Sequence, residues 1–156
     1  MKLRSTIIGI LASRTALPAS PPRIASYTFC GSAPALAAST KEGTYAQIGA
    51  ECGVVFTIVP NGDIVKSILF DEGGVASTLK AGSIVCDMSS VTPVESKECY
   101  TRLKEKGVGF IDAPVSGGEP GAVAGTLAIM AGGEEKDFQA LKEYFDILGS
   151  SALLIG

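Results

Sequence analysis

Residues 83–112 read SIVCDMSSVTPVESKECYTRLKEKGVGFID. The stretch begins with an apolar run, Ser83–Met88, and ends with another, Val108–Asp112, and each run has the length of a buried strand. The residues between the two runs predict a single helix. A strand, a helix and a second strand in this order are typical of a βαβ unit, in which both strands lie parallel in one sheet.

Start and stop signals define that helix. Thr92 suits the N-cap, Pro93 suits the first helical position, and Glu95 completes a capping box. Gly107 ends the helix after Lys106, because glycine readily adopts the conformation that terminates a helix. The sequence therefore predicts a helix over residues 93–106.

The same alternation of strands and helices continues on both sides. Strands are predicted at Val54–Val59 and Thr126–Ala131, and helices at Asp63–Phe70 and Glu134–Leu148. Weaker signals indicate strands at Thr6–Leu11, Ile24–Cys30 and Ser151–Ile155 and a helix at 40–51. Apolar strands that alternate with helices predict an α/β fold with a mainly parallel sheet.

Composition excludes several classes of function. The 156 residues are 46% hydrophobic and 19% charged, and the net charge of −3 offers no basic surface for nucleic acid. The chain has no His, so it supports neither His-based catalysis nor a His-ligated metal, and no metal site is expected. The four cysteines form no C-x-x-C pair and are expected to be reduced packing residues. No apolar run is long enough to span a membrane, and a cytoplasmic location is expected.

The first residues are open to two readings. Lys2 and Arg4 precede a short apolar run at 7–12, which superficially resembles a secretory signal peptide. The run is short and Arg14 follows it, which favours a first β-strand instead. Residues 12–23 are rich in Pro, Ser and Ala and are expected to be irregular.

Three loops of small and polar residues follow predicted strands. They are Pro60-Asn61-Gly62, Ser89–Thr92 and Ala113–Gly118. In a parallel sheet these loops meet at the carboxyl edge, where ligands of α/β proteins bind. Ordinary turn chemistry explains any one of them alone, but three together indicate a ligand site.

The third loop carries a family resemblance. The residues Asp112-Ala113-Pro114-Val115-Ser116-Gly117-Gly118 resemble the signature loop of the β-hydroxyacid dehydrogenases, and Gly125-Thr126-Leu127 and Met130-Ala131-Gly132-Gly133 continue it. Asp87–Pro93 and Val59-Pro60-Asn61 resemble that family's cofactor loops. The branch most similar is that of 2-hydroxy-3-oxopropionate (tartronate semialdehyde) reductase and 3-hydroxyisobutyrate dehydrogenase. The resemblance implies a Rossmann-like, doubly wound fold and hydride transfer between NAD(P)H and a small hydroxy acid or semialdehyde.

The resemblance also implies roles for single residues. The residues expected to bind substrate are Ser116, Gly117 and Gly118. The residues expected to contact the cofactor, NADP or NAD, are Val59, Pro60, Asn61 and Ser90. A serine hydroxyl followed by two unhindered glycine amides agrees with such a role, because together they form a cradle for a small anion.

The chain departs from the family in two places. The family begins with G-x-G-x-x-G, but only Gly9 is present in the apolar run at 7–12, so the N-terminal βαβ unit is expected to be incomplete or atypical. The family's catalytic Lys and helical domain are expected beyond Gly156. The expected organisation is an atypical segment at 1–32 and an NAD(P)-binding domain, like that of 6-phosphogluconate dehydrogenase, at 33–156.

These departures leave two functions open. The chain is either the cofactor-binding domain of a reductase whose full-length relatives are homo-oligomers, or a non-catalytic nucleotide-binding fragment. In both cases the isolated chain is expected to be inactive, because no catalytic residue is expected within it.

Overall fold

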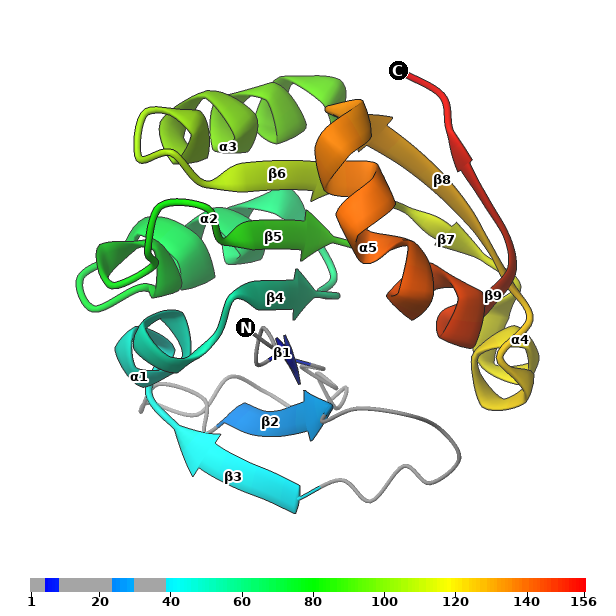
Figure 1. The fold of residues 1–156 in the computed structure, drawn as a ribbon, viewed down its shortest axis with the longest axis horizontal. Coiled ribbons are helices and arrows are strands. Elements are labelled where there is room, and N and C mark those ends of the chain that lie inside the picture. The colour runs from blue at the N-terminus through cyan, green and yellow to red at the C-terminus, as the bar shows by residue number, and fades with distance from the viewer. Residues whose placement is uncertain (1–4, 9–23, 30–38) are drawn as a thin grey trace.

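The sheet is organised around three parallel strands (Figure 1). The structure is a computed structural model that describes residues 5–8, 24–29 and 39–156. Strands β4 (Val54–Thr57), β5 (Ile84–Asp87) and β6 (Gly109–Asp112) pair in parallel at its centre. Within the described ranges the strand order is β3-β2-β1-β4-β5-β6-β8-β7, with β9 on β8. The predicted α/β fold with a mainly parallel sheet is confirmed.

The first three strands extend the sheet beyond β4. Strand β1 (Ser5–Ile8) is parallel to β4, and β2 (Ile24–Phe29) and β3 (Ser39–Gly43) follow in antiparallel pairing. The predicted strands Thr6–Leu11 and Ile24–Cys30 are confirmed for residues 6–8 and 24–29, whereas β3 was not predicted. The irregular stretch predicted at 12–23 lies outside the described residues.

The weak helix predicted at 40–51 is correct only in its second half. Helix α1 (Tyr45–Glu51) begins after Thr44, whose hydroxyl accepts the Gln47 amide in a capping box. Residues 40–43 belong to β3 instead, because they pair with β2. Pairing with β2 therefore determines the conformation of residues 40–43, which a local sequence pattern does not reveal.

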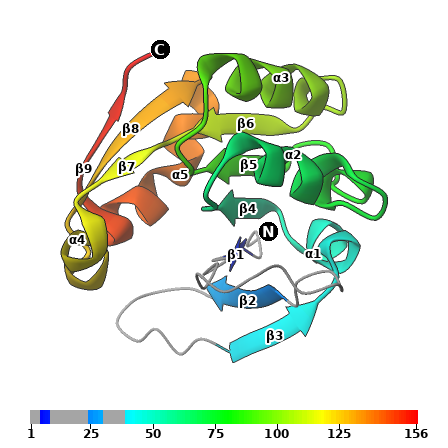
Figure 2. The same ribbon diagram turned by 180° about the vertical axis from the view of Figure 1, so that it is seen from behind.

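Helices cover both faces of the sheet. Figures 1 and 2 show α2 (Gly62–Phe70) and α3 (Pro93–Lys104) on one face and α5 (Glu135–Leu148) on the other. Alternate residues of each central strand point to opposite faces. Val55 therefore packs in the same cluster as α1, α2 and α3, whereas Phe56 packs in the cluster that contains α5.

The helix signals of the sequence are largely confirmed. Thr92 and Glu95 form the predicted capping box of α3, with Pro93 at its first position. The helix ends at Lys104, two residues before the predicted end, and Gly107 then takes a φ of +69°. On α5 the predicted apolar stripe is buried at Phe138, Leu141 and Phe145. None of the helices in the described ranges is both long enough and apolar enough to cross a bilayer.

Three elements were not predicted from the sequence besides β3. The 3-10 turn η1 (Val75–Ser77) lies between α2 and β5, and strand β7 (Val115–Ser116) and helix α4 (Gly118–Ala124) lie in the C-terminal part of the chain. Strand β8 (Leu127–Gly133) was predicted, but it runs antiparallel to β6. Strand β9 (Gly149–Leu154) pairs in parallel with β8 and forms the outer edge.

Candidate functional site

The carboxyl ends of β4, β5 and β6 lie side by side (Figure 1). In the register of the sheet Thr57 pairs with Asp87, and Asp87 pairs with Asp112, so the three strands end at the same level. The three loops singled out in the sequence start from these residues. We refer to this edge, from Thr57, Asp87 and Asp112 outward, as the carboxyl edge.

The first two loops are bonded to each other. The Val59 N–H donates to Ser89 Oγ at 2.9 Å, and the Met88 N–H donates to the Thr57 carbonyl at 2.7 Å. Val59 is buried, whereas Pro60 and Ser90 are exposed next to these bonds. The fold therefore bonds the predicted cofactor residue Val59 to Ser89 and leaves the next residue, Ser90, exposed.

Asn61 has a structural role in addition to the predicted one. Its Oδ1 accepts the Ile64 N–H at 3.0 Å and caps α2. A hydrogen bond of this kind satisfies one of the unpaired amides at a helix start. The cap fixes how the chain turns from β4 into α2, and Asn61 itself remains exposed.

The third loop turns away from the other two. The Ala113 N–H donates to the Asp87 carbonyl at 2.7 Å, and Ser116 then pairs with Ala128 of β8. Figures 1 and 2 show β7 and α4 beyond the carboxyl ends of the parallel strands. Ser116, Gly117 and Gly118 are exposed, as Ser90 is.

The two glycines of this loop have backbone angles that other residues rarely adopt. Gly117 has a φ of +135° and Gly118 a φ of +60°. Positive φ values of this kind are strained for residues with a Cβ, so glycine is required at both positions. A Cβ on Gly117 would also lie 3.2 Å from Leu127 Cδ2.

A buried hydrogen-bond network lies beneath the first two loops. Asp87 Oδ1 accepts from Thr57 Oγ1 at 2.8 Å, from Ser89 Oγ at 2.6 Å and from the Ser89 N–H at 3.2 Å. All three residues are at most 2% exposed. None of these three side chains was predicted individually as a site residue. The sequence pattern that points to them is a carboxylate at the end of an apolar run, followed by hydroxyl residues.

Two carboxyl oxygens at the carboxyl edge have no hydrogen-bond partner. Among the described residues, the buried side-chain atoms in this position are Asp87 Oδ2 and Asp112 Oδ1. Burial raises the pKa of Asp87, although its bonds from Ser89 and Thr57 act in the opposite direction. Burial also raises the pKa of Asp112, and the neighbouring Asp87 charge adds to the effect. The edge thus contains two carboxyl groups that the fold does not fully satisfy.

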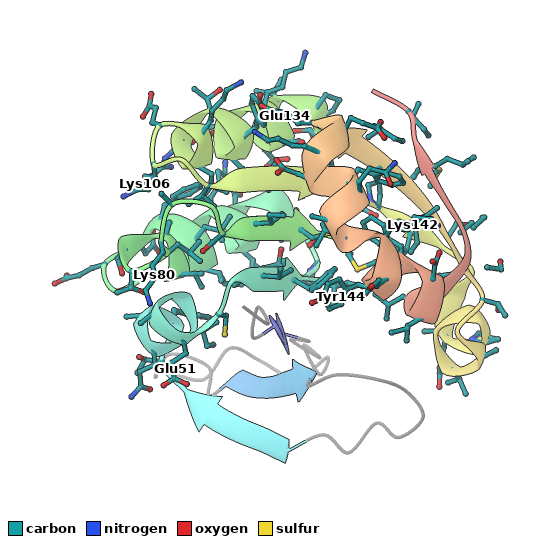
Figure 3. All side chains as sticks on the ribbon, in the orientation of Figure 1. Glu51, Lys80, Lys106, Glu134, Lys142 and Tyr144 are labelled. Carbon is teal, nitrogen blue, oxygen red and sulfur yellow. The ribbon has the colours of Figure 1, made fainter. Side chains whose placement is uncertain are left out.

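An aromatic side chain from the other layer borders the carboxyl edge. Figure 3 shows Tyr144 of α5 beside the end of β4, and its ring centroid lies 5.4 Å from that of Phe56. Tyr144 is half-buried. Tyr144 was not predicted as a site residue, because it lies outside the apolar stripe of α5.

Two of the described cysteines, Cys86 and Cys99, are buried in the core. Burial raises the pKa of the Cys99 thiol to about 11, and it raises the pKa of Cys86 as well. Both thiols are therefore protonated at neutral pH and act as packing residues, as expected from the sequence. In the part of the chain that the structure describes, no three acidic, Cys or His side chains are grouped as a metal site would require.

Comparisons with known proteins agree with this geometry. The chain is 40% identical over 113 residues to 2-hydroxy-3-oxopropionate reductase of Escherichia coli, a match that covers 72% of this chain and 39% of that protein. It is 39% identical over 110 residues to 2-(hydroxymethyl)glutarate dehydrogenase of Eubacterium barkeri, covering 70% of this chain and 36% of that protein. The chain thus spans about two fifths of the length of these relatives.

The fold is likewise found among solved structures. A crystal structure of 3-hydroxyisobutyrate dehydrogenase from Salmonella typhimurium is similar with a TM-score of 0.67 and 31% identity, covering 72% of this chain and 39% of that one. The family described as the NAD binding domain of 6-phosphogluconate dehydrogenase matches residues 31–156. The resemblance found in the sequence is therefore confirmed, and the chain belongs to this family of NAD-binding domains, which β-hydroxyacid dehydrogenases share.

Proposed function

We propose that residues 33–156 form the cofactor domain of a β-hydroxyacid dehydrogenase most like 2-hydroxy-3-oxopropionate reductase. The observation that carries the proposal is the carboxyl edge, where the loops after β4 and β5 are bonded through Val59 and Ser89. Ligands of open α/β sheets bind at this edge. Family membership supports a nicotinamide cofactor as the ligand.

The cofactor contacts are assigned to the first two loops. The residues are Val59, Pro60, Asn61 and Ser90. Their support is that Ser90 and Pro60 are exposed over a buried, hydrogen-bonded base, so a flat ring could lie on them without deforming the loops. NADP or NAD supplies or accepts the hydride when it is bound.

The substrate contacts are assigned to the third loop, at Ser116, Gly117 and Gly118. The positive φ values and the exposure of the two glycines support an anion cradle, because exposed glycines let a ligand approach the backbone closely. The carboxylate of a small hydroxy acid or semialdehyde has the charge and size for such a cradle. Ser116 adds a hydroxyl that can orient the reacting carbon.

The chain by itself should not turn over substrate. In the family that the chain resembles the proton donor is a Lys, and no residue of this sequence is expected to take that role. A positioned acid or base typically contributes about 10²–10⁴-fold to the rate. The described residues of this chain therefore bind and orient rather than complete the reaction.

The second candidate is a nucleotide-binding domain without catalysis. The missing second and third glycines of G-x-G-x-x-G favour it, because those glycines hold the pyrophosphate at a helix start. Both candidates share the same edge. They differ in whether substrate affects the bound cofactor.

A calorimetric titration with NADPH and with NADH tests the proposal. Saturable binding of one of them is expected, weakened in Ser90→Ala and unchanged in Ser77→Ala, an exposed serine of η1 outside the three loops. Tartronate semialdehyde should then tighten cofactor binding in the wild type but not in Ser116→Ala.

Three outcomes separate the readings. Cofactor binding without any effect of substrate favours the non-catalytic domain. No binding of either cofactor contradicts both candidates. Steady NADPH consumption that disappears in Ser116→Ala would show instead that the chain is a complete enzyme.

A further inference from the structure

The hydrogen bonds at the carboxyl edge converge on one atom. Thr57 on β4 and Ser89 in the loop after β5 both donate to Asp87 Oδ1. Ser89 Oγ has a second role, because it accepts the Val59 N–H at 2.9 Å. A continuous chain of bonds therefore runs from Asp87 through Ser89 to the backbone of the first cofactor loop.

The network is unusual because it is costly to bury. Asp87 has no exposed surface, and its second oxygen, Oδ2, has no partner. Burying a carboxyl group without full hydrogen bonding destabilises a fold. The strands themselves do not need this carboxyl group, since β4 and β5 pair through their backbones. The contribution of the Asp87 carboxyl group is therefore to hold the hydroxyl groups of Thr57 and Ser89.

We infer that Asp87 is a positioning residue, which acts through Ser89 to fix the Val59 amide and hence the spacing of the loops after β4 and β5. Its influence on cofactor affinity rests on the proposed function, whereas its influence on Val59 does not. Asp87 touches no ligand in this role. Asp87 fixes the positions of Val59, Pro60 and Ser90 relative to one another.

The geometry makes a sharp prediction about substitutions. All three bonds end on Oδ1, so Asp87→Asn can retain them with its carbonyl oxygen, whereas Asp87→Ala removes them all. Ser89→Ala leaves Asp87 and Thr57 in place and breaks only the link to Val59. The matched control is Ser83→Ala, because Ser83 is also a buried serine but lies before β5, at the opposite end of the strand.

The first readout is amide exchange by NMR, which requires no ligand. The reference amide is that of Ile84, which bonds to the Gly53 carbonyl before β4 at 2.9 Å. In Ser89→Ala the Val59 amide should exchange about tenfold faster, the effect of one lost hydrogen bond, with Ile84 unchanged. Asp87→Asn should retain Val59 protection, and Ser83→Ala should leave it unaltered. Asp87→Ala should accelerate Val59 exchange with Ile84 unchanged; should it fail to fold, Asp87→Leu, which also lacks the acceptor but fills the buried site, is the second variant, and unchanged Val59 exchange in it would overturn the role of Asp87.

The second readout is the affinity for NADPH and NADH, measured where each variant is fully folded. Ser89→Ala should weaken the binding of whichever cofactor the wild type takes by about tenfold, whereas Asp87→Asn should retain most of the wild-type affinity. Unchanged Val59 exchange in Ser89→Ala, or equal acceleration at Val59 and Ile84, would overturn the inference. A wild type that binds neither cofactor contradicts the proposed function, while Val59 exchange still decides whether Asp87 sets the loop.

Discussion

The two ends of the parallel strands are built differently. At the amino end the contacts between strands are made by the backbone: the Ile84 N–H bonds to the Gly53 carbonyl, and the Gly109 N–H bonds to the Ser83 carbonyl. At the carboxyl end the same kind of backbone bond is present, from Met88 to Thr57 and from Ala113 to Asp87, and side-chain bonds to Asp87 are added to it. The difference between the two ends is therefore the buried side-chain network at the carboxyl end.

The difference separates stability from binding. Backbone bonds between strands satisfy polar groups at little cost, whereas the unpartnered oxygens of Asp87 and Asp112 weaken the fold where they lie. Substitutions at the amino end should therefore change stability alone. Substitutions at the carboxyl end should change stability and ligand binding together.

The largest effect is expected at the amino end, in Gly49→Ala. A Cβ on Gly49 would overlap the Val75 carbonyl oxygen, which is backbone and cannot easily move. Alanine gains about 1 kcal/mol of helix propensity over glycine, but overpacking costs about 3 kcal/mol, so a net loss of about 2 kcal/mol is expected. Urea denaturation measures it.

Gly156→Ala is the control for that substitution, because its Cβ would meet no atom within 4 Å. Cofactor affinity should be the same in Gly49→Ala and wild type when both are folded. A loss of affinity in Gly49→Ala would contradict the separation of the two ends.

The next effect compares one hydroxyl at each end. Thr57→Val removes a donor to Asp87, and Thr78→Val removes the 2.6 Å bond from Thr78 Oγ1 to the Ala46 carbonyl. Each should lower the free energy of unfolding by about 1 kcal/mol, the usual net value of a hydrogen bond. Only Thr57→Val should also weaken cofactor binding, which calorimetry would detect. Equal effects on binding would remove the distinction.

A smaller effect concerns pH and the carboxyl edge. Burial raises the pKa of Asp112 in the folded chain, so the fold binds this proton more tightly than the unfolded chain does. Stability should therefore decline as the pH rises above about 3.9, the ordinary Asp value. The side chain introduced by Asp112→Asn does not titrate, so the free energy of unfolding of this variant should fall less than that of the wild type between about pH 4 and 7. If the free energy of unfolding depends on pH in the same way in the wild type and in Asp112→Asn, burial of Asp112 is not the cause of the decline.

The smallest effect has the opposite sign and lies at the surface. Glu134 accepts from Tyr100 and pairs with Lys104 and Lys136, which lowers the pKa of Glu134 to about 2. Its stabilisation is present above about pH 4.3 and is lost as the pH falls toward the lowered value. Figure 3 shows Glu134 at the start of α5.

Glu134→Gln should therefore lower the Tm slightly at neutral pH, and the difference should vanish in acid and shrink in high salt. Glu143→Gln, an exposed glutamate on the same helix, is the control. A difference that persists at high salt would indicate packing rather than charge.

Much of the fold could be predicted because local and tertiary signals agree. The apolar runs of β4 to β6 and the capping box of α3 are confirmed with shifts of one or two residues. Elements without such signals were missed. Helix α4 reads GEPGAVA, a composition that propensity alone does not favour, and β7 has only two residues. The direction of β8 depends on its partner β6, which periodicity cannot reveal.

The loops of the candidate site could be predicted from the sequence, but the buried hydrogen-bond network beneath them could not. Glycine and hydroxyl residues after apolar strands indicated the exposed side chains, such as Ser90 and Ser116. The role of Asp87 was hidden, because an acidic residue at the end of a strand usually begins a loop. Its burial depends on Thr57, thirty positions away in the sequence, whose side chain faces it across the sheet.

Strand β9 has a consequence for solubility. In the described part of the chain it pairs with β8 alone, so its outer backbone groups form an open edge. Leu153 is 65% exposed on this strand, and Ile155, just beyond it, is 70% exposed. An apolar open edge is a template on which another extended segment can add as a new strand. We therefore expect this edge to favour self-association of the chain, so that its apparent mass in solution rises with concentration.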